Sequence, residues 1–358
     1  MRTSQTVSCK LNYYQFYDGA ARKWVFGHMF NSIALWFYNP VTIRGRVWKK
    51  LIILAPNIIR ILSKRLSRNT DISVHNFIDC KYFFNQSDLH FSLVTVQETV
   101  YKKNIIQVYN SSAVLGFIKI SGDEQTKNSF DREVFILNLL NSKGVECTPK
   151  VLGYVSEIET KETAFIQSSI YDKKRKALKK LDKLHLDFLN GLYDKVNLGP
   201  EYFVQNIQSL SDRIHGVRSE LIKNKVDLKS VLEKCSRRIL DTESRFSISH
   251  GDFTYWNCYQ YDKSLFVYDW EYAEIGMPKY LDLYHYKIQP LIYVKQSSAD
   301  SIMVSILKDD YLSRIDTNRV LMRFYLCYMI ILYASRTDND LREDDKRAIT
   351  TWCELLRS

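Results

Sequence analysis

Residues 249–271, SHGDFTYWNCYQYDKSLFVYDWE, set several polar side chains among apolar ones. Asp252 follows a His-Gly pair, Asn257 stands five residues later, and Asp269 ends the apolar run SLFVYD. Polar groups placed among hydrophobic stretches cost free energy unless they are paired. This density of polar residues therefore indicates chemistry rather than packing.

The residue types indicate which chemistry this is. An Asp on a tight turn with a small neighbour can accept a proton from a hydroxyl nucleophile, which is the role that Asp252 suits. The turn at residues 261–264 predicts a hairpin that brings Asp269 back close to Asn257. One carboxylate and one amide oxygen would then converge on a site suited to Mg²⁺ held together with substrate phosphates.

The elements that must position these residues follow from hydrophobic periodicity. Alternating or β-branched runs predict strands, and apolar residues at helical spacing, with Gly144 as the stop, predict a helix. The predicted strands are 90–100, 104–110, 114–121, 148–155 and 163–170, and the predicted helix is 130–144. A mostly helical region begins at 173 and includes 176–189. This order predicts a smaller α+β lobe before a larger helical lobe.

The composition is that of a soluble globular protein, with 46% hydrophobic and 25% charged residues in a chain of 358. Seven scattered Cys without a CxxC spacing argue for reduced thiols in the cytoplasm and against a zinc site or a disulfide framework. The first twenty residues have no apolar core of a signal peptide, and no run is long enough to predict a membrane span.

The positive charge is concentrated near the N-terminus. Residues 1–85 contain 13 Lys and Arg against 3 Asp and Glu, a net charge of +10 out of +11 for the chain. Residues 41–68 contain eight of these basic residues and no acid, and Pro56 divides them into two predicted helical pieces. Such a basic amphipathic segment can lie on an anionic membrane surface. The alternative is a helix packed on the body with a solvated basic rim.

The spacing H-x-D-x-x-x-x-N, followed by a strand that ends in Asp, matches the catalytic loop and metal-binding Asp of kinases. This stretch resembles the aminoglycoside phosphotransferase and choline kinase-like family, in which the two motifs read H-G-D-x-x-x-x-N and D-W-E. Further runs are similar to that family: TPKVLGYV (148–155), ALKKLDKLH (177–185) and, with one extra residue, GMPKYLDL (276–283). The resemblance covers about residues 90–290.

The resemblance implies an α+β, protein kinase-like bilobal fold, with a small β-rich N-lobe at 86–170 and a larger, mainly helical C-lobe at 171–358. Residues 1–85 fall outside it as a basic amphipathic extension. It also implies that Asp252 is the catalytic base and that Asn257 and Asp269 hold Mg²⁺. Asp282 is expected to tether the catalytic loop, and His250 to organise it without transferring a proton.

The nucleotide-binding residues are expected in the N-lobe. The resemblance implies a strand lysine that contacts phosphate, for which Lys119 in GFIKIS is the best placed, and a helix glutamate that orients it, for which we select Glu133. Adenine is expected near Gln167, Ser168 and Ser169, mainly on backbone groups. The donor is expected to be ATP, with GTP as the alternative. No glycine-rich run is present, so 101–104 or 110–112 would have to cover the phosphates.

The acceptor is less well determined. Residues 290–358 contain ten basic and ten acidic residues, whereas a cationic aminoglycoside calls for an acidic pocket. The basic extension favours a small-molecule or glycan hydroxyl, with sugar-type or lipid-linked cell-surface glycans first. The expected location is the cytoplasm, peripheral on the inner face of the membrane. An aminoglycoside or choline-type kinase remains an alternative, as does a catalytically silent scaffold. A protein kinase is disfavoured because no A-P-E run follows Asp269, and nucleic-acid binding is not expected.

Overall fold

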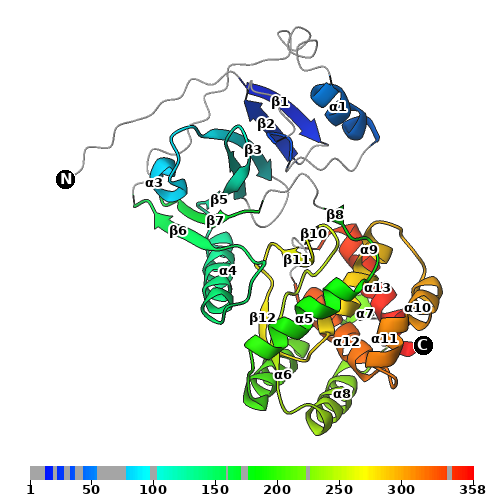
Figure 1. Cartoon of the computed structure of the whole chain (residues 1–358). Helices are drawn as coiled ribbons and strands as arrows, with labels where there is room; N and C mark the ends of the chain where they lie inside the picture. The colour runs from blue at the N-terminus through cyan, green and yellow to red at the C-terminus, as the bar shows by residue number, and fades with distance from the viewer. Residues whose placement is uncertain are drawn as a thin grey trace. The chain divides into compact units, whose positions relative to one another are not determined.

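The computed structural model describes residues 13–18, 22–27, 33–36, 43–54, 78–96, 103–158, 160–170, 176–222, 226–336 and 341–358. The chain divides into two compact units. The first comprises residues 1–138 and 149–173, and the second comprises 139–148 and 174–358. Figure 1 labels the helices and strands of both units.

The first unit is built on a seven-stranded antiparallel sheet in the order β1-β2-β3-β4-β5-β7-β6. Its helices are α1 (Ile43–Leu54), α3 (Cys80–Phe84) and α4 (Glu124–Ser142), and α4 continues into the second unit from Leu139. The strands are β1 (Tyr13–Asp18), β2 (Arg22–Gly27), β3 (His90–Val96), β4 (Lys103–Tyr109), β5 (Val114–Ser121), β6 (Val151–Ser156) and β7 (Thr163–Ser168).

Alternation along the strands decides which side chains form the core of this unit. Ile106, Ile118 and Ile166 are in register on β4, β5 and β7, and they belong to one buried cluster that also contains Cys80 of α3. Because successive side chains of a strand point to opposite faces, Lys119 lies on the other face of β5. The strong alternation of this central sheet is why the sequence predicts β3 to β7. The apolar period predicts α4, which begins at Glu124, before the expected start at 130.

The N-terminal part of the first unit differs from the expected elements in its strands. Strands β1 and β2 were not predicted, and they extend the sheet beside β3 from within the basic segment. The predicted helical segment before Pro56 is present as α1, whereas the segment after Pro56 lies outside the described residues. Two segments were expected to cover the nucleotide phosphates. Residues 110–112 form the turn between β4 and β5, and 101–104 is only partly described.

The second unit is mainly helical, with two small sheets. Its helices are α5 (Lys183–Lys195), α6 (Pro200–Ile214), α7 (Ser219–Ile222), α8 (Leu228–Thr242), α9 (Leu281–Tyr293), α10 (Ala299–Leu307), α11 (Asp310–Ile315), α12 (Val320–Ala334) and α13 (Glu343–Arg357). Strands β8 (Lys176–Ala177), β10 (Cys258–Tyr261) and β11 (Ser264–Val267) form one sheet, and β9 (Ser247–Ser249) pairs with β12 (Glu274–Met277).

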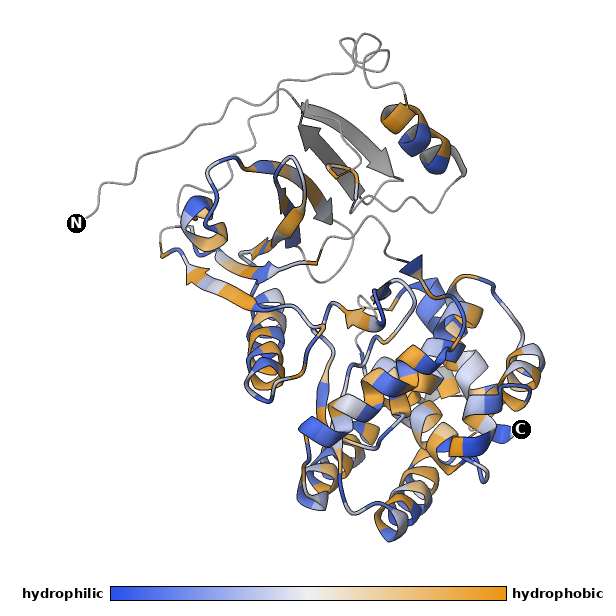
Figure 2. Ribbon diagram, viewed as in Figure 1, coloured by the Kyte–Doolittle hydropathy of each residue, from blue (hydrophilic) through white to orange (hydrophobic). Residues whose placement is uncertain are grey.

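The apolar helix α12 lies at the centre of this unit and packs against α6, α8, α9 and α13. Most of its side chains are buried, as its nearly continuous hydrophobic sequence predicts. The surrounding helices are amphipathic: on α8 the buried residues Leu228, Leu232, Cys235 and Ile239 follow helical spacing. Figure 2 shows hydrophobic and hydrophilic residues on different sides of such helices.

One helix begins later than predicted. The sequence indicated a helix from 176, but residues 176–177 form β8 and α5 begins only at Lys183. The cause is a capping box at Asp182, whose carboxylate accepts a hydrogen bond from the Leu184 N–H, 3.1 Å away. In return, Nδ1 of His185 accepts one from the Asp182 N–H, at 3.0 Å. These bonds satisfy the free N–H groups of the first turn and start the helix at that point.

Candidate active site

The loop that carries Asp252 follows β9 and begins with a conformation that requires glycine. Gly251 has a φ of +77°, and a Cβ on it would lie 2.2 Å from the carbonyl oxygen of Tyr272. No other residue fits both the left-handed backbone and this close approach. The glycine of the His-Gly-Asp sequence therefore shapes the turn that presents Asp252.

The side chain of Asp282, at the start of α9, holds this turn in place. Its carboxylate accepts hydrogen bonds from Ser249 Oγ at 2.8 Å, from His250 N–H at 2.8 Å and from Gly251 N–H at 3.2 Å. Asp282 is buried, and charge-assisted bonds of this kind are about twice as strong as neutral ones. The expectation that Asp282 tethers the loop is confirmed.

His250 is completely buried and organises the inside of the loop. Its Nδ1 accepts from the Asp252 N–H at 3.1 Å, so its Nε2 carries the proton and donates to the Tyr268 carbonyl at 2.7 Å. Burial lowers the pKa of His250, against the opposing effect of the Asp282 and Asp252 carboxylates. The ring is thus neutral, and it packs beside the buried indole of Trp270, which is a packing residue as expected.

Asp252 and Asn257 lie against each other. Nδ2 of Asn257 donates to Oδ2 of Asp252 at 2.8 Å and to the Asp252 carbonyl oxygen at 3.0 Å. Because both partners are acceptors, the amide orientation of Asn257 is determined, and its Oδ1 takes part in neither bond. Asn257 therefore holds the carboxylate with its nitrogen and presents its oxygen elsewhere.

His285, which was not predicted as a site residue, contacts the other oxygen of Asp252. Its Nε2 lies 3.3 Å from Asp252 Oδ1, and its side chain is buried on α9 one turn after Asp282. A histidine three residues after the loop-binding Asp was the only signal available, and it has no meaning until α9 is placed beside the loop.

The predicted hairpin is present. Cys258 pairs with Val267 and Tyr261 with Ser264, and the Tyr268 N–H donates to the Asn257 carbonyl at 2.9 Å. This register brings the residue after Tyr268, which is Asp269, back to the end of the loop that carries Asp252. Asp269 has a φ of +64°, a left-handed conformation that Asp adopts more readily than most residues and that turns the chain sharply after β11.

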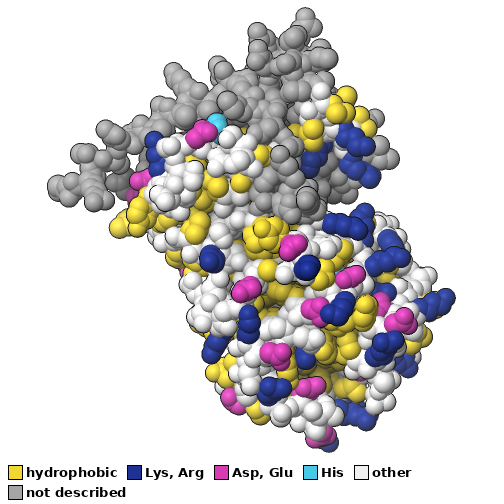
Figure 3. Space-filling model, viewed as in Figure 1, with side chains coloured by type: hydrophobic (Ala, Val, Ile, Leu, Met, Phe, Trp, Pro, Cys, Tyr) yellow, Lys and Arg dark blue, Asp and Glu magenta, His cyan; other side chains and the backbone are white. Residues whose placement is uncertain are grey.

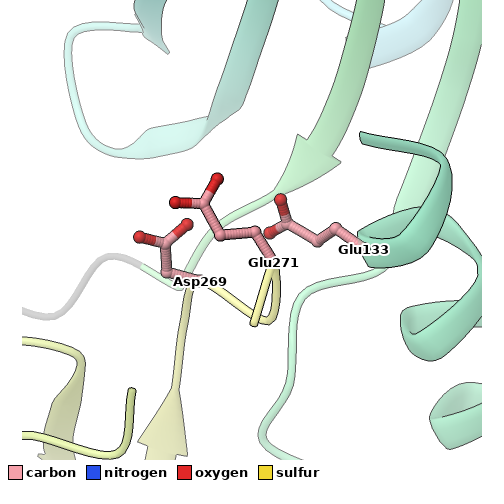
Figure 4. Close-up of side chains that lie close together, drawn as sticks. All are labelled: Glu133, Asp269 and Glu271. Carbon is pink, nitrogen blue, oxygen red and sulfur yellow. The ribbon is translucent and has the colours of Figure 1, made fainter. Parts of the chain in front are cut away.

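Asp269 and Glu271 direct their carboxylates to the same side of this turn (Figure 4). One oxygen of each lies within 4.8 Å of the other. Carboxylate oxygens at this separation are donors of the kind that Mg²⁺ prefers. The residues present therefore fit a magnesium ion, and Glu271 is an additional candidate ligand. Glu133, also labelled in Figure 4, belongs to α4 of the first unit.

Within the first unit, Lys119 and Glu133 form a buried ion pair. Lys119 Nζ on β5 lies 2.6 Å from Glu133 Oε2 on α4, and their side chains are 5% and 0% exposed. The ammonium also lies 5.8 Å from the ring centre of Phe165. Lys119 and Glu133 are fourteen positions apart in the sequence and were expected to pair. The structure brings them together.

Gln167, Ser168 and Ser169 lie at the end of β7. The Ser168 N–H donates to the Lys150 carbonyl and the Ser169 N–H to the Leu115 carbonyl, each at 2.9 Å. These two backbone donors are therefore used within the first unit. The buried Oε1 of Gln167 has no hydrogen-bond partner within the described residues.

Comparison with known proteins supports the fold. No protein-family model matches the chain, and no curated protein matches it by sequence. Among solved structures, a thermostable mutant of aminoglycoside phosphotransferase APH(4)-Ia in ternary complex with AMP-PNP and hygromycin B matches at 12% identity and a TM-score of 0.50. This match covers 74% of this chain and 93% of the other.

Two further matches have lower TM-scores. Choline kinase LicA from Streptococcus pneumoniae has 12% identity and a TM-score of 0.43 over 71% of this chain and 89% of its own. The gentamicin complex of APH(2")-IIa has 14% identity and a TM-score of 0.43 over 80% and 99%. The expected resemblance is confirmed for the fold: this chain has the α+β protein kinase-like fold that aminoglycoside phosphotransferase APH(4)-Ia also has.

Proposed function

We propose that the protein is a Mg²⁺-dependent kinase that transfers the γ-phosphate of ATP to a hydroxyl of a small molecule or glycan. The observation that carries this proposal is the Asp252 carboxylate, whose two oxygens are contacted by Asn257 Nδ2 and His285 Nε2. Asn257 uses only its nitrogen for its hydrogen bonds to Asp252, so these bonds do not involve its Oδ1. A base and a hard-oxygen ligand set on one turn are what phosphoryl transfer to a hydroxyl requires.

In this mechanism each group of the chain has one task. Asp252 orients the acceptor hydroxyl and takes its proton as the acceptor oxygen bonds to the γ-phosphorus. The bond from that phosphorus to the bridging oxygen breaks, and ADP leaves with its electron pair. Asn257, Asp269 and Glu271 would hold Mg²⁺, which when bound neutralises negative charge on the phosphates.

The first unit supplies the other charges. Lys119 would contact the donor phosphates, and Glu133 holds its ammonium at a defined point on the sheet. The end of β7, at Gln167, Ser168 and Ser169, would receive adenine. The ternary complex of APH(4)-Ia contains AMP-PNP, an adenine nucleotide, which supports ATP as the donor, with GTP as the alternative.

For the acceptor, we favour a sugar-type hydroxyl presented at an anionic membrane surface, because of α1. This helix contains four basic residues and no acid, and Val47, Leu51 and Leu54 are exposed at 50%, 44% and 80%. Their spacing of four and three places them along one stripe, beside the exposed Arg46 and Lys50. Figure 3 shows hydrophobic and basic side chains together over α1. No helix within the described ranges is long and apolar enough to cross a membrane.

The test is phosphate transfer from labelled Mg-ATP by the purified full chain to a panel of acceptors. The panel holds free sugars, lipid-linked glycan extracts, aminoglycosides, and choline with ethanolamine, and Asp252→Ala is the blank. Transfer to sugars or lipid-linked glycans would support the whole proposal. Transfer to aminoglycosides or choline would support the kinase and replace the acceptor. Nucleotide binding without transfer to any acceptor or to water would favour a silent scaffold.

A further inference from the structure

We propose that His285 is a positioning residue for Asp252, and that Tyr325 and Gln289 hold His285 in the one tautomer that can do this. The inference rests on the proposed function, because Asp252 is the base only if the chain transfers phosphate. The four side chains form a continuous series: Gln289 Nε2 to Tyr325 Oη at 3.1 Å, Tyr325 Oη to His285 Nδ1 at 3.4 Å, and His285 Nε2 to Asp252 Oδ1 at 3.3 Å.

The direction of the hydrogen bonds follows from the Gln289 end. The Gln289 amide nitrogen can only donate, so Tyr325 Oη accepts from it and directs its own proton to His285 Nδ1. With Nδ1 accepting, the proton of the neutral imidazole is on Nε2, where it faces the Asp252 carboxylate. Burial raises the pKa of Tyr325, so its hydroxyl retains the proton it donates.

The alternative, a doubly protonated His285, is disfavoured by the same contacts. A proton on Nδ1 would give Tyr325 Oη two donors, from Gln289 and from His285. The Tyr325 hydroxyl proton would then lose the acceptor that the described contacts provide. Because Tyr325 and Gln289 are 1% and 3% exposed, water cannot easily replace that partner.

The position of these residues on α9 explains how the hydrogen-bonded side chains hold the catalytic loop. Asp282, His285 and Gln289 are spaced three and four apart, so they lie on one side of the helix. Asp282 binds the backbone of the loop, whereas His285 binds the side chain at its tip. Tyr325 approaches from α12, the buried helix at the centre of the unit. One helix side therefore sets both the path of the loop and the rotation of the Asp252 carboxylate.

Positioning from both sides has a consequence for the reaction. With Asn257 on Oδ2 and His285 on Oδ1, the carboxylate plane is held, and the remaining lone pairs point in defined directions. A hydroxyl that binds there meets an oriented acceptor. Removal of His285 should therefore slow turnover without weakening nucleotide binding, because no proposed nucleotide ligand contacts this side chain.

The kinetic test compares His285→Leu, which removes the donor, with His285→Gln, whose Nε2 can replace it at similar reach. The substrate is Mg-ATP, and the rate of ADP formation is measured. The phosphate is transferred to water or, where the panel identifies one, to the acceptor. We expect His285→Leu to lower kcat about 10- to 100-fold with the KM for Mg-ATP within about twofold, and His285→Gln to recover most of the loss. Equal activity of His285→Leu and the parent protein, or a rise of KM alone, would overturn the proposal.

A second readout separates this inference from the proposed function. In protein labelled with ¹⁵N-histidine, side-chain spectra should show His285, assigned by its absence in His285→Gln, as the Nε2–H tautomer. Tyr325→Phe should convert part of the population to the other tautomer, and Gln289→Leu should do so less. If the parent protein releases no ADP, the proposed function fails, and a fixed Nε2–H tautomer still shows that Tyr325 and Gln289 hold His285 with its N–H toward Asp252. An Nδ1–H or cationic His285 would refute the inference even in an active enzyme.

Discussion

Lys119 Nζ lies 2.6 Å from Glu133 Oε2, inside the first unit and almost out of contact with water. A buried pair of this kind is expensive to break, because the remaining charge keeps its desolvation cost and loses its partner. The pair therefore couples the stability of the sheet and α4 to the position of the proposed phosphate-binding ammonium.

We expect Glu133→Gln to destabilise the first unit by about 3 kcal/mol and to weaken ATP binding. The double variant Lys119→Met/Glu133→Gln, which removes both charges, should recover much of the stability but none of the ATP affinity. Thermal unfolding and nucleotide titration on the same samples measure the two effects. Recovery of ATP binding in the double variant would show that Lys119 does not contact the phosphates.

Asp252→Ala should reduce phosphate transfer at least about 100-fold, because the hydroxyl loses the group that takes its proton. Nucleotide binding should persist, since Asp252 is not among the proposed ligands of the nucleotide or the metal. The measurement is initial rate against Mg-ATP concentration, with a thermal shift as the binding control. Retained transfer in this variant would remove Asp252 from the mechanism.

Asp269→Asn should abolish the part of ATP stabilisation that depends on Mg²⁺. Ligand at about 100 times its Kd stabilises a protein by about 2.7 kcal/mol, which corresponds to a thermal shift of several degrees. The matched control is Asp262→Asn, an exposed Asp at the turn of the same hairpin that also has a positive φ. A Mg-ATP shift as large in Asp269→Asn as in Asp262→Asn would count against the metal role.

Val47→Glu should weaken binding to vesicles rich in phosphatidylglycerol by about tenfold or more, because it adds a negative charge to the exposed apolar stripe of α1. The matched control is Val304→Glu on α10, since these two valines are 50% and 48% exposed. Point substitution is preferable to deletion of the segment, because β1 and β2 belong to the sheet. Equal vesicle binding by both variants would favour a packed α1 with a solvated rim.

Stability should decline in weak acid because of His185. Burial lowers the pKa of His185 from 6.5 to about 4, so below pH 6.5 the unfolded chain takes up a proton that the folded chain does not. The free energy of unfolding then falls with pH between about 6.5 and 4, by about 1.5 kcal/mol from pH 6.5 to 5.

His185→Asn should keep an acceptor for the Asp182 N–H and lose this pH dependence, as measured by urea unfolding at several pH values. His215→Asn, at an exposed histidine, is the control. The same loss of stability between pH 6.5 and 5 in His185→Asn and the parent protein would assign the acid sensitivity to other groups.

Much of the fold and the loop was predictable because the signals are local. Alternation along β3 to β7, the apolar period of α4 and the two-residue turn at Asp262 each depend on neighbours within a few positions. Gly251 and Asp252 belong to a motif whose conformation is set by its own residues and by Asp282. The start of α5 was wrong because apolar period alone cannot outweigh a strong N-cap at Asp182.

The sequence by itself determined which groups are available: the Asp252, Asn257 and Asp269 spacing, the strand that carries Lys119, and the basic charge of the N-terminal segment. Only the tertiary structure decided which of them meet. Asp252 and His285 are 33 positions apart, and His285 and Tyr325 are 40 apart. No local pattern encodes these contacts, because they depend on how α9 and α12 pack around the loop once the whole core has formed.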